Sequence, residues 1–260
     1  MSFSIFLLKI LSMPYLDNEI KEKFIQKFLK IKNKGWVKSH RKHNTGIGKT
    51  FEDLMGISEN NDESADFEDI EIKTQRKGSN SKVTLFTKAP QPKGINTVIR
   101  DNYGIVDNSG YKKIHTTLTA LEFNTFKKKF KFKLDVDEEL KRVNIIIKNV
   151  ETNEIKNIAF YDFNTLEEKL KKKLTNLAYV IGETKEKEDE EYLKYIDLTL
   201  YMNISFDNFL KLLKEGKIVY DIRIGTYKTG KNLGKVHDHG SGFRCSSEYL
   251  DYLYFTKEEY

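Results

Sequence analysis

Two carboxylates and a lysine in one short stretch have the types and the spacing that phosphodiester hydrolysis requires. Asp66, Glu71 and Lys73 form the pattern Asp-x4-Glu-x-Lys. Carboxylate oxygens bind Mg²⁺, which neutralises a phosphate and lowers the pKa of a bound water, and an adjacent ammonium group can orient or activate that water. The pattern alone also fits a surface strand with a salt bridge on one face, so the elements that position it matter.

An alternating strand is expected to carry this pattern. Residues 69–74 alternate polar and apolar side chains. In a strand, this places Ile70 and Ile72 on the core face and Glu71 with Lys73 on the other face. Asp66 lies at the entrance to the strand. The two carboxylates are therefore expected to converge on one cation.

A third acidic residue, Glu52, precedes the strand in a segment with helical spacing. Phe51, Leu54 and Met55 define the buried stripe of a short helix. Glu52 on this helix could reach the metal directly or through a water molecule. The alternative is an exposed acid on a helix surface.

A second candidate group lies nearer the C-terminus and suits the recognition of base pairs. Residues 218–225 alternate as another strand, with Asp221 and Arg223 on one face. Arginine donates two hydrogen bonds to guanine O6 and N7, and aspartate accepts one from cytosine N4. The loop 228–235 suits backbone phosphates and leads to residues 237–244, which hold further donors and acceptors. The alternative is a strand with one salt bridge and a loop with satisfied histidines.

Two other motifs carry less weight. Residues 46–50 end like a P-loop, but the first glycine of that motif would fall at His43, and no apolar strand precedes it. The run 237–239, His-Asp-His, contains metal-ligating types, but adjacent ligands alternate sides in an extended chain, and no suitably spaced Cys or further His follows. The sequence argues against a P-loop and supports a zinc site only weakly.

The composition is that of a folded, basic protein. The chain has 260 residues, with 45 Lys and Arg against 39 Asp and Glu, a formal net charge of +6 and 38% hydrophobic residues. This length allows one large domain or two lobes. The single cysteine, Cys245, excludes an internal disulfide framework. No segment is long and apolar enough for a membrane span, and residues 2–8 are expected to begin a packed helix rather than a secretory signal. We therefore expect a soluble cytoplasmic protein with no membrane partner.

The charges are segregated along the chain. Residues 30–49 hold seven Lys and Arg and no acid, residues 50–72 hold nine acids and no base, and residues 216–244 hold six Lys and Arg against two Asp. Two basic stretches around an acidic one suit a polyanion held at a metal site, although lysine-rich surfaces are also common. Four side chains of the first stretch are candidates for phosphate contacts: Lys38, Arg41, Lys42 and Lys49.

Strand and helix patterns are mixed along the chain without a regular βαβ order, which indicates a mixed α/β fold with a largely antiparallel component. Strands are expected at residues 83–88, 130–136, 143–150, 158–161 and 177–181. Helices are expected at residues 19–32, around Leu166, Leu170 and Leu174, and from Ser205 to Gly216. The charged segment 183–191 is expected to be a solvated loop or helix end. Residues 1–130 and 131–260 are expected to form two lobes of one compact unit.

Five segments, in the same order along the chain, resemble the MvaI/BcnI family of type II restriction endonucleases, which are relatives of the MutH mismatch-repair nickase. The segments are residues 44–54 (NTGIGKTFEDL), 66–74 (DFEDIEIKT), 85–88 (LFTK), 221–225 (DIRIG) and 237–240 (HDHG). The middle of the chain matches only by its pattern of strands and helices.

The resemblance implies a PD-(D/E)XK nuclease core, as in MutH, with a C-terminal DNA-recognition lobe. Asp66, Glu71 and Lys73 are then the catalytic residues, and the two acids bind Mg²⁺. Glu52 falls on the auxiliary helix acid, and Lys88, in the third segment, joins the expected phosphate contacts. The residues that fall on base-reading positions are Asp221, Arg223, His237, Asp238, His239 and Arg244.

The resemblance also implies a monomer that cuts double-stranded DNA at a short pseudopalindrome of the CCWGG or CCSGG kind. The segment that ends at Arg244 is more similar to the member that reads a central A·T pair, so CCWGG is expected. A cognate DNA methyltransferase belongs to such a system, with no direct contact implied. Two alternatives stay open: a MutH-like strand nickase, and a DNA-binding module whose acidic strand is only structural.

Overall fold

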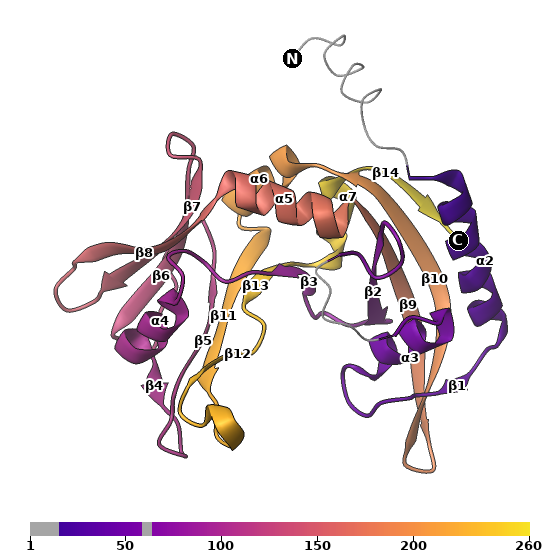
Figure 1. The fold of residues 1–260 in the computed structure, drawn as a ribbon, viewed down its shortest axis with the longest axis horizontal. Coiled ribbons are helices and arrows are strands. Elements are labelled where there is room, and N and C mark those ends of the chain that lie inside the picture. The colour runs from indigo at the N-terminus through magenta and orange to yellow at the C-terminus, as the bar shows by residue number, and fades with distance from the viewer. Residues whose placement is uncertain (1–15, 59–63) are drawn as a thin grey trace, which may run out of the picture. The chain divides into compact units, whose positions relative to one another are not determined.

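The computed structural model of the protein describes residues 16–58 and 64–260 (Figure 1). The helix expected to begin at residues 2–8 lies outside the described residues. The chain divides into two compact units, unit 1 and unit 2. Among the described residues, unit 1 consists of 16–58, 64–81, 170–205 and 250–260, and unit 2 consists of Lys82–Lys169 and Phe206–Tyr249. These segments interleave along the chain, so a single boundary near residue 130 does not describe the division.

Unit 1 contains a five-stranded sheet in the order β1, β10, β9, β2, with β14 also paired to β10. Its strands are β1 (Val37–Lys38), β2 (Ile70–Arg76), β9 (Asn176–Lys187), β10 (Glu190–Ile204) and β14 (Tyr254–Glu259). The described pairs are antiparallel, except β2 and β9, which run parallel. The helices of this unit are α2 (Asn18–Asn33), α3 (Gly46–Met55) and α7 (Leu250–Leu253).

The helices α2 and α3 pack their apolar stripes against the sheet of unit 1. Phe24 and Phe28 of α2 and Phe51 of α3 are buried in one cluster with Ile70 and Ile72 of β2. Since side chains alternate along a strand, Glu71 and Lys73 point to the opposite face of β2. This is the alternation that the sequence predicted, and it separates the apolar core from the acidic pattern.

Unit 2 contains a six-stranded sheet in the order β3, β13, β11, β5, β4, with β12 paired to β11, and a separate three-stranded sheet. The larger sheet comprises β3 (Val83–Thr87), β4 (Ile105–Val106), β5 (Lys112–Leu118), β11 (Ile218–Thr226), β12 (Val236–Asp238) and β13 (Gly242–Cys245). The smaller sheet comprises β6 (Phe130–Asp137), β7 (Arg142–Asn149) and β8 (Ile155–Asp162). The helices of unit 2 are α4 (Ile95–Tyr103) and α6 (Phe206–Lys214). The unit also has two 3₁₀ turns, Gly230–Asn232 and Ser247–Tyr249. Helix α5 (Phe163–Leu174) has residues in both units.

An aromatic cluster forms the core of unit 2 under the larger sheet. The ring centroid of Phe243 lies 5.1 Å from Phe86, 5.1 Å from Tyr220, 5.3 Å from Tyr161 and 5.5 Å from Phe209. The hydroxyl of Tyr161 donates a hydrogen bond of 2.8 Å to that of Tyr220, which satisfies a buried polar group. Because the rings occupy one face of β11, the residues that alternate with Tyr220 are presented on the other face.

The predicted mixed α/β fold, with a largely antiparallel component, is confirmed. The expected strands are present as β3, β6, β7, β8 and β9, and the expected helices as α2, α5 and α6. Segments without clear periodicity form the edge strands β1, β4 and β14, which the sequence did not predict.

The prediction that residues 183–191 form a solvated loop or helix end is wrong, because this segment is the tip of the long β9–β10 hairpin (Figure 1). Glu188 and Asp189 form its turn, with φ values of 55° and 60°. Lys187 and Glu190 are paired across the strands next to this turn. The pairing of the two strands orders a segment that has no apolar period of its own.

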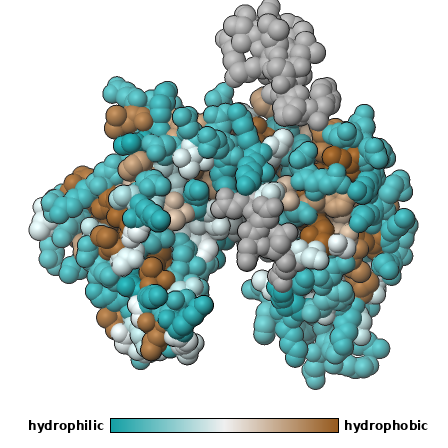
Figure 2. All heavy atoms as spheres, in the orientation of Figure 1, coloured by the Kyte–Doolittle hydropathy of each residue, from teal (hydrophilic) through white to brown (hydrophobic). Residues whose placement is uncertain are grey.

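No helix in residues 16–58 or 64–260 is long and apolar enough to cross a membrane. The face shown in Figure 2 carries mostly hydrophilic residues, with hydrophobic residues scattered between them.

Candidate active site and nucleic-acid interface

Asp66 and Glu71 lie close together because a tight turn reverses the chain between them. Phe67 and Ile70 exchange two backbone hydrogen bonds, of 3.0 and 2.8 Å, at the start of β2. The residues just outside this pair are Asp66 on one side and Glu71 on the other. Asp66 is also held by the backbone N–H of Ile72, which donates a hydrogen bond of 3.0 Å to its Oδ2 atom. The short Asp-x4-Glu spacing therefore brings both carboxylates to the start of β2.

Glu71 is a buried carboxylate between two lysines. Its side chain is 1% exposed. Lys73 donates a hydrogen bond to Oε1, and Nζ of Lys173, in the last turn of α5, lies 3.1 Å from Oε2. Burial raises the pKa of the Glu71 carboxyl, the neighbouring charge of Asp66 raises it further, and the two lysines oppose this shift.

The oxygen Oε2 of Glu71 fits a role as a metal ligand. It is fully buried, and no group among the described residues donates a well-directed hydrogen bond to it. Lys173 approaches this atom as an ion-pair partner only. An orphaned carboxylate oxygen next to the second carboxylate of Asp66 is the donor type that Mg²⁺ prefers. Two protein carboxylates would leave the other positions to water and substrate oxygens, which is usual for Mg²⁺.

The described part of the chain contains no cluster of three or more His, Cys, Asp or Glu side chains suited to a metal ion. The weak zinc hypothesis for the run 237–239 gains no support from the structure. The same finding bears on Glu52, which does not complete a three-acid cluster with Asp66 and Glu71.

Glu52 lies on α3, on the side that faces Thr74 of β2. A β-carbon at Gly48 would lie 4.0 Å from Glu52 Oε1 and 3.4 Å from Thr74 Oγ1. Thr74 alternates with Lys73 along β2 and so belongs to the face that packs against α3. The structure thus unites Asp66, Glu71 and Lys73, and it places Glu52 on the helix side of the same strand.

The basic stretch that leads into α3 faces acidic residues of unit 1. Lys38 forms an ion pair of 2.6 Å with Glu190, and Lys49 forms one of 2.6 Å with Asp53. Arg41 and Lys42 line a pocket of about 720 Å³ together with the acidic tip of the β9–β10 hairpin. The expected phosphate contacts in this stretch therefore have acidic neighbours in the protein itself. The remaining candidate, Lys88, follows β3 in unit 2.

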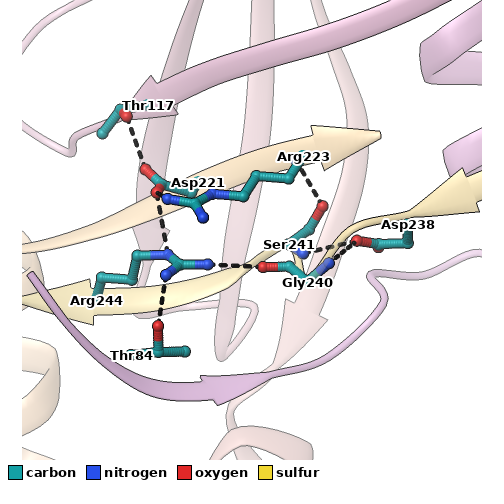
Figure 3. A network of polar contacts seen from close by, with 8 residues as sticks. All are labelled: Thr84, Thr117, Asp221, Arg223, Asp238, Gly240, Ser241 and Arg244. Carbon is teal, nitrogen blue, oxygen red and sulfur yellow. Dashed lines mark hydrogen bonds and ion pairs between the residues drawn. The ribbon is translucent and has the colours of Figure 1, made fainter. Parts of the chain in front are cut away.

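A polar network centred on Asp221 lies on the larger sheet of unit 2 (Figure 3). Oδ1 of Asp221 accepts a hydrogen bond of 2.7 Å from Thr117, and Oδ2 accepts one of 2.9 Å from Arg223 Nη2. Nε of Arg244 lies 3.0 Å from the same Oδ2. The Arg244 contact is an ion pair, since its Nε–H is not directed at any acceptor among the described residues.

Two of the expected base-reading residues are committed to contacts inside unit 2. Arg244 donates hydrogen bonds to Thr84 and to the backbone oxygen of Gly240, and its side chain is 11% exposed. Oδ1 of Asp238 accepts hydrogen bonds from the backbone N–H groups of Gly240, at 2.9 Å, and Ser241, at 2.6 Å (Figure 3). These contacts shape the turn between β12 and β13. Arg223, with 43% of its side chain exposed, is available to a ligand.

The histidines of this unit lie around the exposed end of the network. The rings of His237 and His239 are 4.0 Å apart, and His237 stacks on Tyr227 with centroids 4.0 Å apart. A pocket of about 540 Å³ opens beside Asp221 and Arg223. Its lining residues are His115, Thr116, Thr117, Asp221, Ile222, Arg223 and His239.

Comparison with known proteins identifies the family of the chain. The model of the MvaI/BcnI restriction endonuclease family matches residues 25–254. The chain belongs to the MvaI/BcnI restriction endonuclease family. It is accordingly a DNA-cleaving hydrolase by family, as the five sequence segments predicted.

Two solved structures are similar to this family member over almost its whole length. One is restriction endonuclease MvaI in complex with its cognate DNA substrate, with 33% sequence identity and a TM-score of 0.86, covering 94% of this chain and 99% of that chain. The other is MvaI in the absence of DNA, with 33% identity and a TM-score of 0.63, covering 95% and 99%. No curated protein sequence matches the chain.

Two candidate residues of this MvaI/BcnI family member were not found from its sequence. Lys173 belongs to a run of three lysines at the end of α5, and only its burial, with 20% of the side chain exposed, distinguishes it. His115 lies on β5, in a strand that the sequence analysis did not predict. Each residue reaches its site from a distant part of the chain.

Proposed function

We propose that the protein is a Mg²⁺-dependent type II restriction endonuclease that hydrolyses phosphodiester bonds in double-stranded DNA at a short pseudopalindrome, CCWGG. The observation that carries this proposal is the buried Glu71 carboxylate, with one oxygen bonded to Lys73 and the other left without a directed donor beside Asp66. In a restriction endonuclease family, such a group is best explained as half of a metal site.

In this proposal, Asp66 and Glu71 hold the metal ion. A metal ion held there would lower the pKa of a bound water and neutralise the scissile phosphate. Lys73 contacts Glu71 and orients the attacking water through its ammonium group. The positive charge of Lys173 opposes protonation of the Glu71 carboxylate. Glu52 acts as the auxiliary acid from α3.

We assign the PD-(D/E)XK nuclease core to unit 1 and DNA recognition to unit 2. The cognate DNA substrate bound by the similar MvaI structure supports DNA as the ligand. The residues proposed to read bases or to shape the reading surface are Asp221, Arg223, His237, Asp238, His239 and Arg244. Because Arg223 is the most available donor of the Asp221 network, it is our candidate for guanine O6 and N7.

The proposed backbone contacts come from Lys38, Arg41, Lys42, Lys49 and Lys88. Each contact would strengthen binding to any sequence by releasing counterions. The protein is proposed to act as a monomer, in a system that includes a cognate DNA methyltransferase. We assign a central A·T pair to the site because of the sequence segment that ends at Arg244.

The experiment that tests this function is digestion of plasmid DNA with Mg²⁺, followed by sequencing of the cut ends. We expect double-strand ends at CCWGG, and no cleavage when EDTA replaces Mg²⁺. Nicked circles without linear product would favour the MutH-like nickase. DNA binding that is identical with and without Mg²⁺, with intact plasmid, would favour the non-catalytic module. Cleavage of CCSGG at the same rate as CCWGG would exclude the central A·T pair and leave the endonuclease function standing.

A further inference from the structure

We infer that His115, on β5, is a specificity-determining residue that contacts a base edge in the major groove beside Arg223. This inference rests on the proposed DNA recognition by unit 2. His115 and the rest of β5 lie outside the five sequence segments that resemble the family.

The pairing of β5 with β11 places His115 directly beside the candidate base reader. The two strands are antiparallel, with His115 opposite Arg223 and Thr117 opposite Asp221. Side chains of directly opposed residues lie on the same face of a sheet. His115, Thr117, Asp221 and Arg223 therefore form two adjacent rows on one face, and all four line the pocket of about 540 Å³.

The base-reading face needs a hydrogen-bond acceptor that Asp221 can hardly supply. Arg223 offers only donors, whereas the amino groups of adenine N6 and cytosine N4 require an acceptor. The Asp221 carboxylate already accepts from Thr117 and Arg223 and pairs with Arg244, and its side chain is only 11% exposed. Most of its acceptor capacity is used within the protein. A neutral imidazole has both an acceptor nitrogen and a donor N–H.

The ring nitrogens of His115 are available for this role. Within residues 16–58 and 64–260, no hydrogen bond or ion pair involves either ring nitrogen of His115. The ring contact of His115 among these residues is with the ring of His239, edge to face, with centroids 6.0 Å apart. A structural histidine normally has a partner for at least one ring nitrogen. Burial, and the nearby charges of Lys113 and Arg223, lower the pKa of His115 and so favour the neutral ring.

The test compares the cleavage specificity of variants on a library of duplexes in which each position of the site is varied. His115→Ala removes both ring nitrogens, whereas His115→Gln retains one donor and one acceptor. Val106→Ala, on the neighbouring strand β4, is the matched control, since Val106 is 61% exposed and does not line the pocket.

We expect His115→Ala to lose roughly tenfold or more of its discrimination at one base pair, as for other single base contacts. His115→Gln should recover part of this loss, and Val106→Ala should equal the wild type. Binding to a duplex without the site, measured by fluorescence anisotropy without Mg²⁺, should be unchanged in all three. Unchanged thermal unfolding of His115→Ala would exclude misfolding as the cause.

The inference and the proposed function fail in distinguishable ways. If the wild type cuts no member of the library, the proposed endonuclease function is wrong. If the wild type cuts a defined site and His115→Ala cuts the same site with the same preferences, the function stands and the role of His115 is overturned. An equal loss on every sequence would also overturn it, because a base contact must act at one position.

Discussion

The guanidinium of Arg244 and the carboxylate of Asp221 are held together inside unit 2, with Nε 3.0 Å from Oδ2 and both side chains 11% exposed. The same carboxylate oxygen accepts a hydrogen bond from Arg223, whose side chain is 43% exposed. One aspartate thus connects an inner arginine, which supports the turn at Gly240, to an outer arginine that lines the pocket. The two arginines should therefore differ sharply when they are replaced.

Arg244→Ala and Arg223→Ala should separate stability from specificity. Removal of Arg244 leaves Asp221 without its buried counter-ion and should cost about 3 kcal/mol of unfolding free energy. Removal of the more exposed Arg223 should cost less than about 1 kcal/mol, but it should lose roughly 1–3 kcal/mol of discrimination against the wrong base. Urea unfolding and cleavage of single-mismatch duplexes measure the two effects. Equal destabilisation by both substitutions would contradict this division of roles.

Glu71→Gln should abolish cleavage while it stabilises the metal-free protein. The raised pKa means that the folded state favours the neutral form of Glu71 more than the unfolded chain does. Its stabilising contribution is complete below the unfolded value, near 4.5, and is lost as the pH rises through the higher folded value. Since glutamine stays neutral, the advantage of Glu71→Gln over the wild type should grow as the pH rises from the unfolded pKa to the folded pKa and then level off. Unfolding in EDTA across several pH values measures this difference, and an advantage that shrinks with pH would refute it.

Lys173→Ala should move the acidic limb of the pH–rate profile to higher pH. The positive charge of Lys173 lowers the pKa of Glu71, so its removal leaves more of the carboxyl protonated at a given pH. We expect a reduction in cleavage rate of about tenfold at mildly acidic pH, recovered as the pH rises. Lys172→Ala, on the adjacent residue of the same helix turn, is the control. A uniform loss at every pH would indicate that Lys173 has only a structural role.

Glu190→Gln should strengthen non-specific DNA binding. Its carboxylate pairs with Lys38 at 2.6 Å, and the two side chains are 43% and 59% exposed. Such an exposed pair contributes less than about 1 kcal/mol to stability, so the unfolding temperature should not change. Without this partner, Lys38 would be released for a phosphate, and the salt dependence should steepen by about one counterion. Affinity for a duplex lacking the site, measured against salt concentration, tests this, and Lys38→Ala in the same background should cancel the gain.

A nicked plasmid should appear before the linear form. A monomer with the single Asp66–Glu71 pair can cut only one strand in each binding event. A time course of supercoiled plasmid digestion should therefore show the open circle as an intermediate. Direct conversion to linear DNA, together with a dimer in light scattering, would contradict the monomer proposal and leave the catalytic assignment intact.

The sequence by itself determined which local elements carry the chemistry. The strand with Glu71 and Lys73, and the strand with Asp221 and Arg223, followed from alternation with a period of two, which is a property of the extended backbone and needs no partner. The turn that brings Asp66 to Glu71 is equally local. The five ordered segments were sufficient to identify the family, because motif order and spacing are written in the chain itself.

Only the tertiary structure decided which residues surround those elements. Lys173 reaches Glu71, and His115 reaches Arg223, through packing and strand pairing between segments about 100 residues apart. Strand order and register depend on how whole faces of a sheet are buried, which local periodicity does not encode. For the same reason, the charged segment 183–191 was not recognised as a hairpin, since its order comes from pairing across strands rather than from an apolar pattern. The division into interleaved units arises in the same way, because long-range pairing brings β2 beside β9 and β3 beside β13.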